Sequence, residues 1–247
     1  METNQERKTL VLTGASRGIG HATVKRFASA GWRVITVSRQ AFSEDCPWEH
    51  GEDSHVQLDL SDMAALQHGV ADLRQRLAGD GLNALVNNAG ISPKADDGSR
   101  LGTLNTEPDV WTRVFNVNFF APIMLARGLI DELERAQGTI LNVTSIAGSR
   151  VHPFAGSAYA TSKAAMASLT REMAADFGPL GVRVNAIAPG EIDTAILSPG
   201  TDKLVEEIPL RRLGRPEEVA ATIYFLCSQP AGYISGAELH INGGQHV

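Results

Sequence analysis

Residues Leu10-Val-Leu-Thr-Gly-Ala-Ser-Arg-Gly-Ile-Gly20 join a short apolar run to a turn with glycines at positions 14, 18 and 20. The apolar run predicts a strand, and the helical pattern of residues 22–30 predicts that a helix follows. Glycine allows a tight turn and a close approach to a ligand, and the amino end of a helix offers N–H groups to a diphosphate. The spacing differs from the G-x-G-x-x-G of the general dinucleotide fingerprint. Its place between a strand and a helix still predicts a nucleotide site.

Strands and helices are expected to alternate along the rest of the chain. We expect strands at residues 8–13, 33–37, 55–59, 82–87, 138–144, 181–188 and 237–241, and helices at 18–30, 61–78, 107–136, 157–179 and 216–228. This alternation predicts an α/β protein, a single-domain Rossmann fold with a doubly wound parallel seven-stranded sheet and helices on both faces. Ligands of such sheets bind at the carboxyl ends of the strands. Gly14, Asn88, Ser145 and Pro189 each follow a different strand and are expected to meet there.

Length and composition limit the classes of protein. The 247 residues, 43% of them hydrophobic, fit one domain spanning 1–247 without a linker or repeat. The net charge of −6 argues against nucleic acid as the main partner, and no apolar run approaches a membrane span. The polar start of the chain predicts no signal peptide. Cys46 and Cys227 are distant and the histidines form no ligand pair, so we expect a reduced cytoplasmic protein without a metal.

The segment Ser157-Ala-Tyr-Ala-Thr-Ser-Lys163 places Tyr159 and Lys163 four residues apart in a predicted helix. This spacing puts the phenol and the ammonium on one face, one turn apart. A cation ~4 Å away at an effective dielectric of ~20 favours the phenolate by up to ~4 kcal/mol, or about three pKa units. We therefore expect Lys163 to lower the pKa of Tyr159 toward neutrality. Alone, such a pair is more often a solvated helix face, and the glycine turn is what favours the functional interpretation.

Several motifs together resemble the short-chain dehydrogenase/reductase family. They are Thr13-Gly-Ala-Ser-Arg-Gly-Ile-Gly20, Asn87-Asn-Ala-Gly90, Asn118, Ser145, Tyr159-x-x-x-Lys163 and Pro189-Gly190, followed by Ile234-Ser-Gly236 and Asn242-Gly-Gly244. Within the family, the chain resembles bacterial 3-oxoacyl-[acyl-carrier-protein] reductases and their relatives. The resemblance implies an oxidoreductase that interconverts a small-molecule carbonyl and a secondary or primary alcohol by hydride transfer.

The resemblance also implies the catalytic residues, which are Asn118, Ser145, Tyr159 and Lys163. Tyr159 would act as the general acid/base, Lys163 would also hold the nicotinamide ribose, and Ser145 would hydrogen-bond the substrate oxygen. Asn118 would bend a helix and hold a water beside the lysine. Asn116 competes for that position, but counting seven residues from Trp111 selects Asn118.

The serine has competitors as well. Thr144 and Ser149 carry hydroxyl groups close to Ser145 in the sequence. The 14 residues from Ser145 to Tyr159 are one more than is usual in the family. Alignment on Ser145-Ile-Ala-Gly148 still favours Ser145.

Arg39 predicts the choice of nicotinamide cofactor. A dinucleotide fold usually carries an acidic residue after its second strand to bind the NAD ribose, but here the strand is followed by Ser38 and Arg39. A guanidinium at this place can clamp a 2′-phosphate, and Arg17 adds a second cation. We therefore predict NADP (NADPH) as the cofactor. The alternative is that Arg39 only opens the polar loop at residues 40–54.

Further cofactor contacts are implied by the resemblance. Asp59 and Leu60 would contact the adenine, and residues 88–90 would pass the adenosine ribose, although Asn87 and Asn88 also have a purely structural interpretation. Ile192 would offer backbone contacts to the carboxamide and Thr194 its hydroxyl. The full predicted set is Gly14, Ser16, Arg17, Gly18, Ile19, Gly20, Ser38, Arg39, Asp59, Leu60, Asn88, Ala89, Gly90, Tyr159, Lys163, Pro189, Gly190, Ile192 and Thr194.

The sequence does not name the substrate. Residues 195–213 resemble a substrate lid, and Arg150, His152 and Phe154 either line the pocket or only shape a turn. Glu191 suggests a hydroxyl-rich substrate. Two alternatives stay open: a 3-oxoacyl thioester reductase of fatty-acid synthesis, and a non-catalytic NADP-binding sensor.

The resemblance also implies a homotetramer, or at least a dimer. Helices 107–136 and 157–179 would pair between subunits, and strand 237–241 would make a second contact. The small residues of the second helix, Ala158, Ala160, Ala164, Ala165 and Ala167, would let another helix approach closely. The alternative is that these alanines only pack on their own sheet.

Overall fold

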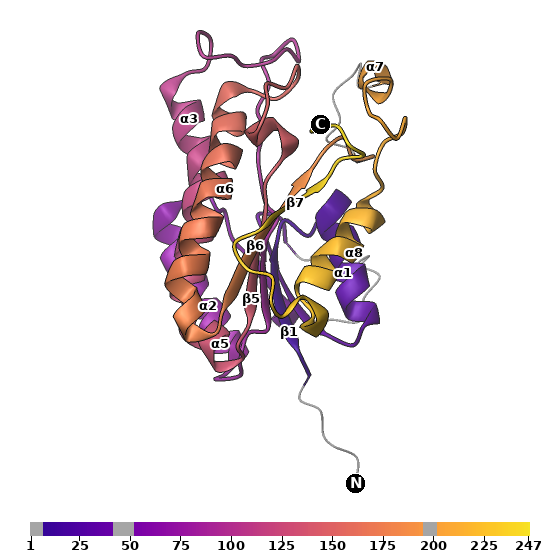
Figure 1. Ribbon diagram of the computed structural model, residues 1–247. Helices are drawn as coiled ribbons and strands as arrows, with labels where there is room; N and C mark the ends of the chain where they lie inside the picture. Colours follow the sequence, from indigo (N-terminus) through magenta and orange to yellow (C-terminus); the bar gives the residue numbers. More distant parts are fainter. Residues whose placement is uncertain (1–6, 42–51, 195–201) are drawn as a thin grey trace.

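The computed structural model describes residues 7–41, 52–194 and 202–247, and they form one parallel sheet covered by helices on both faces (Figure 1). The strands are β1 (Thr9–Thr13), β2 (Arg33–Ser38), β3 (His55–Gln57), β4 (Ala84–Asn87), β5 (Thr139–Val143), β6 (Arg183–Pro189) and β7 (Glu238–Ile241). Their order across the sheet is β3-β2-β1-β4-β5-β6-β7, and all six pairings are parallel. The predicted Rossmann-type fold is therefore confirmed.

The helices form two layers. The main ones are α1 (Gly18–Ser29), α2 (Met63–Leu77), α3 (Pro108–Phe115), α4 (Ala121–Gly128), α5 (Ile130–Arg135), α6 (Ser157–Phe177) and α8 (Pro216–Leu226). Helices α1 and α8 lie together on one face, and α2 to α6 cover the other (Figure 1). Successive side chains of a strand point to opposite faces, so Val11 packs in one core cluster and Leu10 and Leu12 in the other. Every residue of β1 is buried, as expected for a central parallel strand.

One predicted helix is wrong. The single helix expected at 107–136 is divided into α3, a π-helical segment (Asn116–Phe120), α4 and α5. The π segment lies where the side chain of Asn118 hydrogen-bonds both the N–H and the C=O of Ile91. Between α4 and α5, Leu129 leaves the helical conformation with φ −113°. Both interruptions depend on contacts and geometry that a periodic pattern does not contain.

Other boundaries differ by a few residues. Apart from the helix expected at 107–136, the predicted strands and helices begin and end within two residues of the expected positions. The expected lid at 195–213 holds a short helix, α7 (Asp202–Val205), that was not predicted, and residues 195–201 lie outside the described residues. Cys46 also lies outside them.

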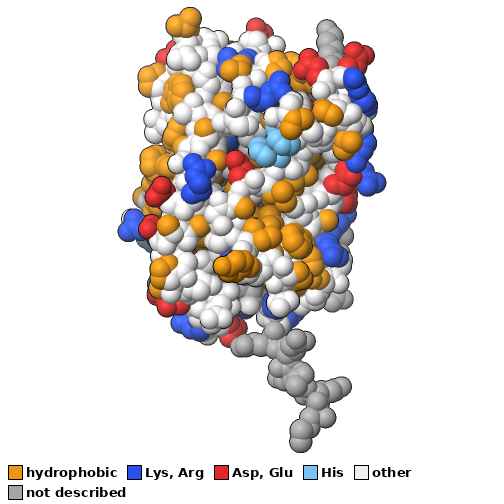
Figure 2. All heavy atoms as spheres, viewed as in Figure 1, with side chains coloured by type: hydrophobic (Ala, Val, Ile, Leu, Met, Phe, Trp, Pro, Cys, Tyr) orange, Lys and Arg blue, Asp and Glu red, His pale blue; other side chains and the backbone are white. Residues whose placement is uncertain are grey.

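The surface carries hydrophobic side chains on one face. Figure 2, in the same view as Figure 1, shows them gathered around β7 and α8. Phe225, Tyr233 and Leu239 are exposed there. None of the helices in the described parts of the chain is long and apolar enough to span a membrane.

Candidate active site

A pocket of about 730 Å³ lies at the carboxyl ends of the strands. All nineteen residues predicted to bind the cofactor line it, as does Ser145. Of the predicted catalytic residues, only Asn118 does not face the pocket. The structure thus brings together groups from the whole length of the chain, because parallel strands all end at the same edge.

The glycine turn forms one wall. Gly14 adopts φ 71°, and a Cβ atom on it would lie 2.8 Å from Cα of Ala89. A Cβ atom on Gly20 would lie 2.0 Å from the carbonyl oxygen of Gly14. No side chain caps the amino end of α1, which opens with Gly18. Helical N–H groups and the positive end of the helix dipole therefore stand beside three positions that carry no side chain, which fits a diphosphate.

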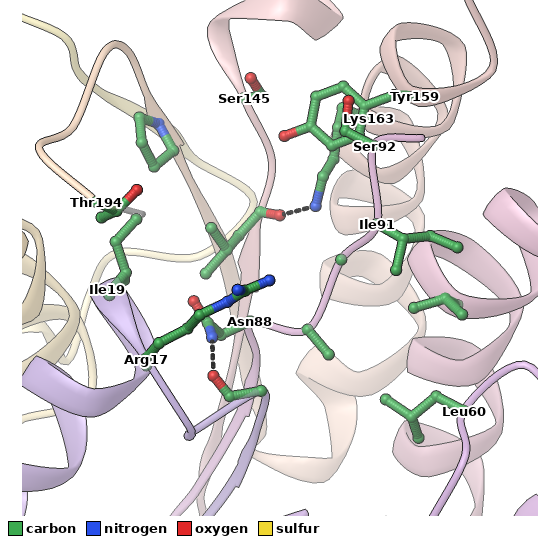
Figure 3. A pocket seen from close by; sticks show the side chains of 18 of the residues that line it. Arg17, Ile19, Leu60, Asn88, Ile91, Ser92, Ser145, Tyr159, Lys163 and Thr194 are labelled. Atoms are coloured by element: carbon green, nitrogen blue, oxygen red, sulfur yellow. Dashed lines mark hydrogen bonds between the residues drawn. The ribbon is translucent and has the colours of Figure 1, made fainter. Parts of the chain in front are cut away.

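The turn is held by Asn88 and Thr13. The Asn88 side chain donates to the carbonyl oxygen of Gly14 over 2.8 Å, as Figure 3 shows. The Thr13 hydroxyl accepts from the N–H groups of Asn88 and Ala89 at 3.1 Å and 3.0 Å. Asn87 is buried and donates to Asn142 over 2.9 Å. The structural interpretation thus fits Asn87, whereas Asn88 both supports the turn and lines the pocket.

Two arginines and one aspartate line the end of the pocket next to β2, and a third arginine, Arg17, lines the pocket from the glycine turn. Arg17, Arg39, Arg113 and Asp59 are all exposed pocket-lining residues. The hydrogen bond from the backbone N–H of Ser61 lowers the pKa of Asp59, and burial opposes this effect. The hydroxyl of Ser61 and the guanidinium groups of Arg39 and Arg113 lower the pKa of Asp59 further. Arg113 was not predicted, because a lone arginine on a helix carries no signal of its own in the sequence. This end is cationic and fits an added phosphate group.

Lys163 lies at the centre of the site. Its ammonium donates to the carbonyl oxygen of Val143 over 2.6 Å (Figure 3). Lys163 is buried, and burial lowers its pKa to about 8. A Cβ atom on Gly90 would lie 3.3 Å from Nζ of Lys163 and 3.5 Å from Oδ1 of Asn118. A side chain at position 90 would therefore press against the ammonium and the Asn118 amide, which glycine avoids.

Tyr159 and Ser145 complete the reactive end. Both point toward the same part of the pocket, as Figure 3 shows, with Nζ of Lys163 5.6 Å from the centre of the Tyr159 ring. The expectation that Lys163 lowers the pKa of Tyr159 is wrong for this structure. Burial raises the pKa of Tyr159 and the charge of Glu191 adds to this, while the hydrogen bond with Ser145 opposes both. The desolvated ammonium instead bonds to the backbone.

The competing hydroxyl groups have other partners. Thr144 donates to the carbonyl oxygen of Ile187 over 2.7 Å and contacts Glu238, and Ser149 donates to Ile146 over 3.0 Å. Ser149 is exposed and lies away from the pocket. The hydroxyl of Ser145 accepts a 3.2 Å hydrogen bond from the N–H of Ala147. Within the described residues, this is the only bond between that hydroxyl and the backbone. Geometry thus favours Ser145 as the hydroxyl facing a substrate oxygen.

The two asparagines are also distinct. Asn118 is buried within the π-helical segment and donates to Ser162 over 3.0 Å besides its two bonds to Ile91. Asn116 is half-buried and donates to the carbonyl oxygen of Ser61 over 3.0 Å. The side chain of Asn118 thus joins the π-helical segment to Ile91, which lines the pocket, and to Ser162 on the helix that carries Lys163.

The segment after β6 forms the opposite wall. Ile192 and Gly214 form a parallel bridge in which Gly214 donates to Glu191 over 2.9 Å and accepts from Asp193 over 2.8 Å. Gly214 bonds to the residues on either side of Ile192, so the N–H and C=O groups of Ile192 itself point away from Gly214. Ile192 lines the pocket, and these groups face it. Thr194 contacts the glycine turn, because a Cβ atom on Gly18 would lie 3.0 Å from its Cγ2. The segment fits the predicted carboxamide contacts.

Near Tyr159 the pocket is lined by polar and aromatic side chains. His152 and Phe154 line it, and Glu191 lines it from the segment after β6. Arg150 does not; it donates to the carbonyl oxygen of Gln245 over 2.6 Å. Nε2 of His152 lies 2.5 Å from Oε1 of Glu191. This pair joins residues 39 positions apart, which no local pattern in the sequence could reveal.

The remaining titratable groups give no second centre. The described residues contain no group of three or more His, Cys, Asp and Glu side chains that could hold a metal ion. Cys227 is buried, and burial raises the pKa of its thiol to about 12.

Comparison with known proteins assigns the family. The family described as enoyl-(acyl carrier protein) reductase matches residues 14–246. The chain is 62% identical to protein FixR of Bradyrhizobium diazoefficiens over 98% of this chain and 88% of that protein. It is 34% identical to 3-oxoacyl-[acyl-carrier-protein] reductase FabG of Aquifex aeolicus, over 99% of each chain.

Solved structures agree. An oxidoreductase of the short chain dehydrogenase/reductase family from Brucella ovis, in complex with a partially ordered NAD, is 62% identical, with a TM-score of 0.84 over 96% of this chain and 100% of that one. A 3-oxoacyl-[acyl-carrier protein] reductase from Brucella melitensis with bound NAD is 29% identical, with a TM-score of 0.85 over 98% and 92% of the two chains. The chain belongs to the short-chain dehydrogenase/reductase family, whose members are oxidoreductases that act on CH–OH groups.

Proposed function

We propose that the protein is an NADP(H)-dependent oxidoreductase that interconverts a carbonyl and an alcohol, with Tyr159 as the general acid/base. The observation that carries this proposal is the convergence of Tyr159, Lys163 and Ser145 on one pocket that also contains the glycine turn. A binding module would need the glycine turn but not a buried ammonium beside a phenol. The non-catalytic sensor is therefore the less favoured alternative.

The side chains divide the work in a simple way. A nicotinamide, when bound, supplies or accepts the hydride. In reduction, Tyr159 donates its phenolic proton to the substrate oxygen, and in oxidation the phenolate takes the proton back. Ser145 hydrogen-bonds the same oxygen and stabilises the charge that develops there. Lys163 keeps a positive charge next to the phenol and is placed to bind ribose hydroxyl groups.

The preference for NADP rests on Arg17 and Arg39. Both are exposed and line the pocket, Arg39 just after β2 and Arg17 in the glycine turn, and a guanidinium can bind a phosphate with two hydrogen bonds. Arg113 adds a third cation that was not anticipated. The solved relatives from Brucella hold NAD, so NADH is the competitor that any test must include.

A second candidate is a 3-oxoacyl thioester reductase of fatty-acid synthesis. It is favoured by the 34% identity to the reductase of Aquifex aeolicus over 99% of both chains. Another relative, a meso-2,3-butanediol dehydrogenase of Serratia marcescens, is 30% identical over 97% of this chain and acts on a diol by its name. Sequence similarity of this degree does not choose between the two.

Oxidation of NADPH and NADH against a panel of substrates tests the proposal. The panel contains β-keto thioesters, diketones, hydroxy ketones, keto sugars and quinones. We expect the wild type to reduce at least one carbonyl compound with NADPH, and we expect Tyr159→Phe to lose this activity. Binding of NADPH without turnover of any carbonyl would instead support the sensor.

We also propose a cytoplasmic homotetramer. The aromatic rings of Trp111, Phe115, Phe119 and Phe120 contact one another in series along α3 and the π segment, and Phe120 is exposed. On α6, Ala158 is buried, whereas Ala164 is exposed and accessible to another helix. The hydrophobic side chains around β7 and α8 offer the second contact (Figure 2). Light scattering at micromolar concentration tests this, and a monomer mass would contradict it.

A further inference from the structure

The His152–Glu191 pair has a defined orientation. Nδ1 of His152 accepts from the backbone N–H groups of Phe154 and Ala155, each at 3.2 Å. A nitrogen that accepts two N–H groups carries no hydrogen, so the ring hydrogen is on Nε2. Nε2 therefore donates to Oε1 of Glu191, at 2.5 Å. The loop backbone thus holds the imidazole, and the imidazole holds the carboxylate.

The carboxylate of Glu191 lies in the same pocket as the reactive end of the site. Glu191 is 9% exposed, and it lines the pocket together with Tyr159 and Ser145. Its charge raises the pKa of Tyr159, which places the two groups within electrostatic reach of each other. A carboxylate accepts hydrogen bonds at two oxygens, and Oε1 is already used by His152. A buried acceptor of this kind favours a ligand that carries a donor.

Nearby cations decide which kind of donor fits. Lys94 lines the pocket and interacts electrostatically with Glu191, and Arg100 lies close to Lys94. Lys94 donates to the carbonyl oxygen of Phe154 and Arg100 to that of Ala155, so both cations are held against the loop that carries His152. Their charge offsets that of Glu191. A neutral donor, a hydroxyl group, is therefore better matched than an ammonium.

We propose that Glu191, oriented by His152, binds a hydroxyl group adjacent to the reacting carbon, so that the substrate class is α-hydroxy ketones and the vicinal diols that correspond to them. This inference rests on the function proposed above and names its substrate. Glu191 contacts the substrate, and His152 is a positioning residue. The same carboxylate disfavours substrates with an anionic group at this position.

Matched substrates that differ by one hydroxyl group test the inference. The ratio of kcat/KM for 3-hydroxybutan-2-one over butan-2-one is measured with NADPH for the wild type, Glu191→Gln and His152→Ala. We expect the wild type to favour the hydroxy ketone by roughly 10- to 100-fold, the value of a charge-assisted hydrogen bond, and both variants to lose most of that ratio. Glu217→Gln, an exposed glutamate on α8, is the matched control and should keep the wild-type ratio.

Several outcomes would overturn the inference. It fails if the wild type does not favour the hydroxy ketone, if Glu191→Gln keeps the preference, or if 1-aminopropan-2-one is preferred to 3-hydroxybutan-2-one. Binding gives an independent readout: saturation-transfer NMR compares butane-2,3-diol with butan-2-ol on wild type and Glu191→Gln. If no ketone is reduced, the proposed function fails. In that case the proposed substrate class is supported if the wild type binds butane-2,3-diol in preference to butan-2-ol and Glu191→Gln does not. Any other binding result contradicts it.

Discussion

The ammonium group of Lys163 donates a 2.6 Å hydrogen bond to the carbonyl oxygen of Val143, which joins the first half of α6 to the last residue of β5. The cation is thereby held out of water between a helix and the sheet. Burial lowers its pKa to about 8, so the folded protein stabilises the neutral amine relative to the ammonium. Burial of the charged lysine therefore destabilises the folded protein relative to the unfolded chain.

The first prediction concerns Lys163→Met. The folded-state pKa lies below the unfolded one, so the unfolded chain binds more protons between pH 8 and about 10.5. The cost is therefore fully present below pH 8 and disappears as the pH rises. The free energy of unfolding of the wild type should rise by ~3 kcal/mol relative to Lys163→Met across that range, and turnover should be lost in the variant. Urea unfolding at both ends of the range measures this; parallel pH curves would contradict it.

The second prediction concerns Tyr159→Phe. This variant should abolish turnover while NADPH binding stays within a few-fold, because the ring remains and only the proton donor is removed. Steady-state kinetics and fluorescence titration with NADPH provide the two readouts. If the variant retains more than about a tenth of the wild-type turnover, Tyr159 is not the general acid/base.

The third prediction is a pH profile. Alcohol oxidation requires the phenolate, and both burial and the charge of Glu191 raise the pKa of Tyr159. We expect kcat/KM for oxidation to increase with pH through the whole neutral range. In Glu191→Gln the negative charge is gone, so the rising limb should move to lower pH. A limb that stays in place would show that Glu191 does not act on Tyr159.

The fourth prediction concerns the cofactor. Arg39→Asp should shift the preference from NADPH toward NADH by roughly 10- to 150-fold, since it replaces a phosphate partner with a repulsive charge that can accept a ribose hydroxyl. Lys25→Asp makes the same change of charge at an exposed position of α1 outside the pocket, and should leave the ratio unchanged. Wild-type protein that already prefers NADH would refute the assignment.

The fifth prediction uses two glycines with opposite surroundings. A Cβ atom on Gly20 would lie 2.0 Å from the carbonyl oxygen of Gly14, whereas one on Gly178 would meet nothing within 4 Å. Gly20→Ala should therefore destabilise the fold by roughly 1–3 kcal/mol and weaken cofactor binding. Gly178→Ala should be neutral or stabilise slightly. Thermal unfolding of the two variants decides this, and equal melting temperatures would contradict it.

The sequence predicted those features that are local. The glycine turn, the alternation of strands and helices that predicts a parallel sheet, and the helix carrying Tyr159 and Lys163 all follow from patterns within a few residues. The division of 107–136 did not, because it depends on bonds between Asn118 and Ile91, 27 positions apart. The raised pKa of Tyr159 was missed for a related reason. An estimate from spacing does not contain the burial of the phenol, which is the largest cause of its raised pKa, nor the charge of Glu191. It also does not contain the Val143 carbonyl, which the ammonium of Lys163 binds.

The π-helical segment Asn116–Phe120 accommodates one more residue than an α-helical turn would. An α-helix advances about 100° per residue, so removing one residue from α3 or α4 would rotate the helix beyond the deletion by roughly that angle and would displace side chains such as Leu125 from the core. Removing one residue from the π segment would instead leave an ordinary α-helical turn and would break the bonds between Asn118 and Ile91. A deletion scan should therefore show a smaller loss of folded protein at these five positions than within α3 and α4.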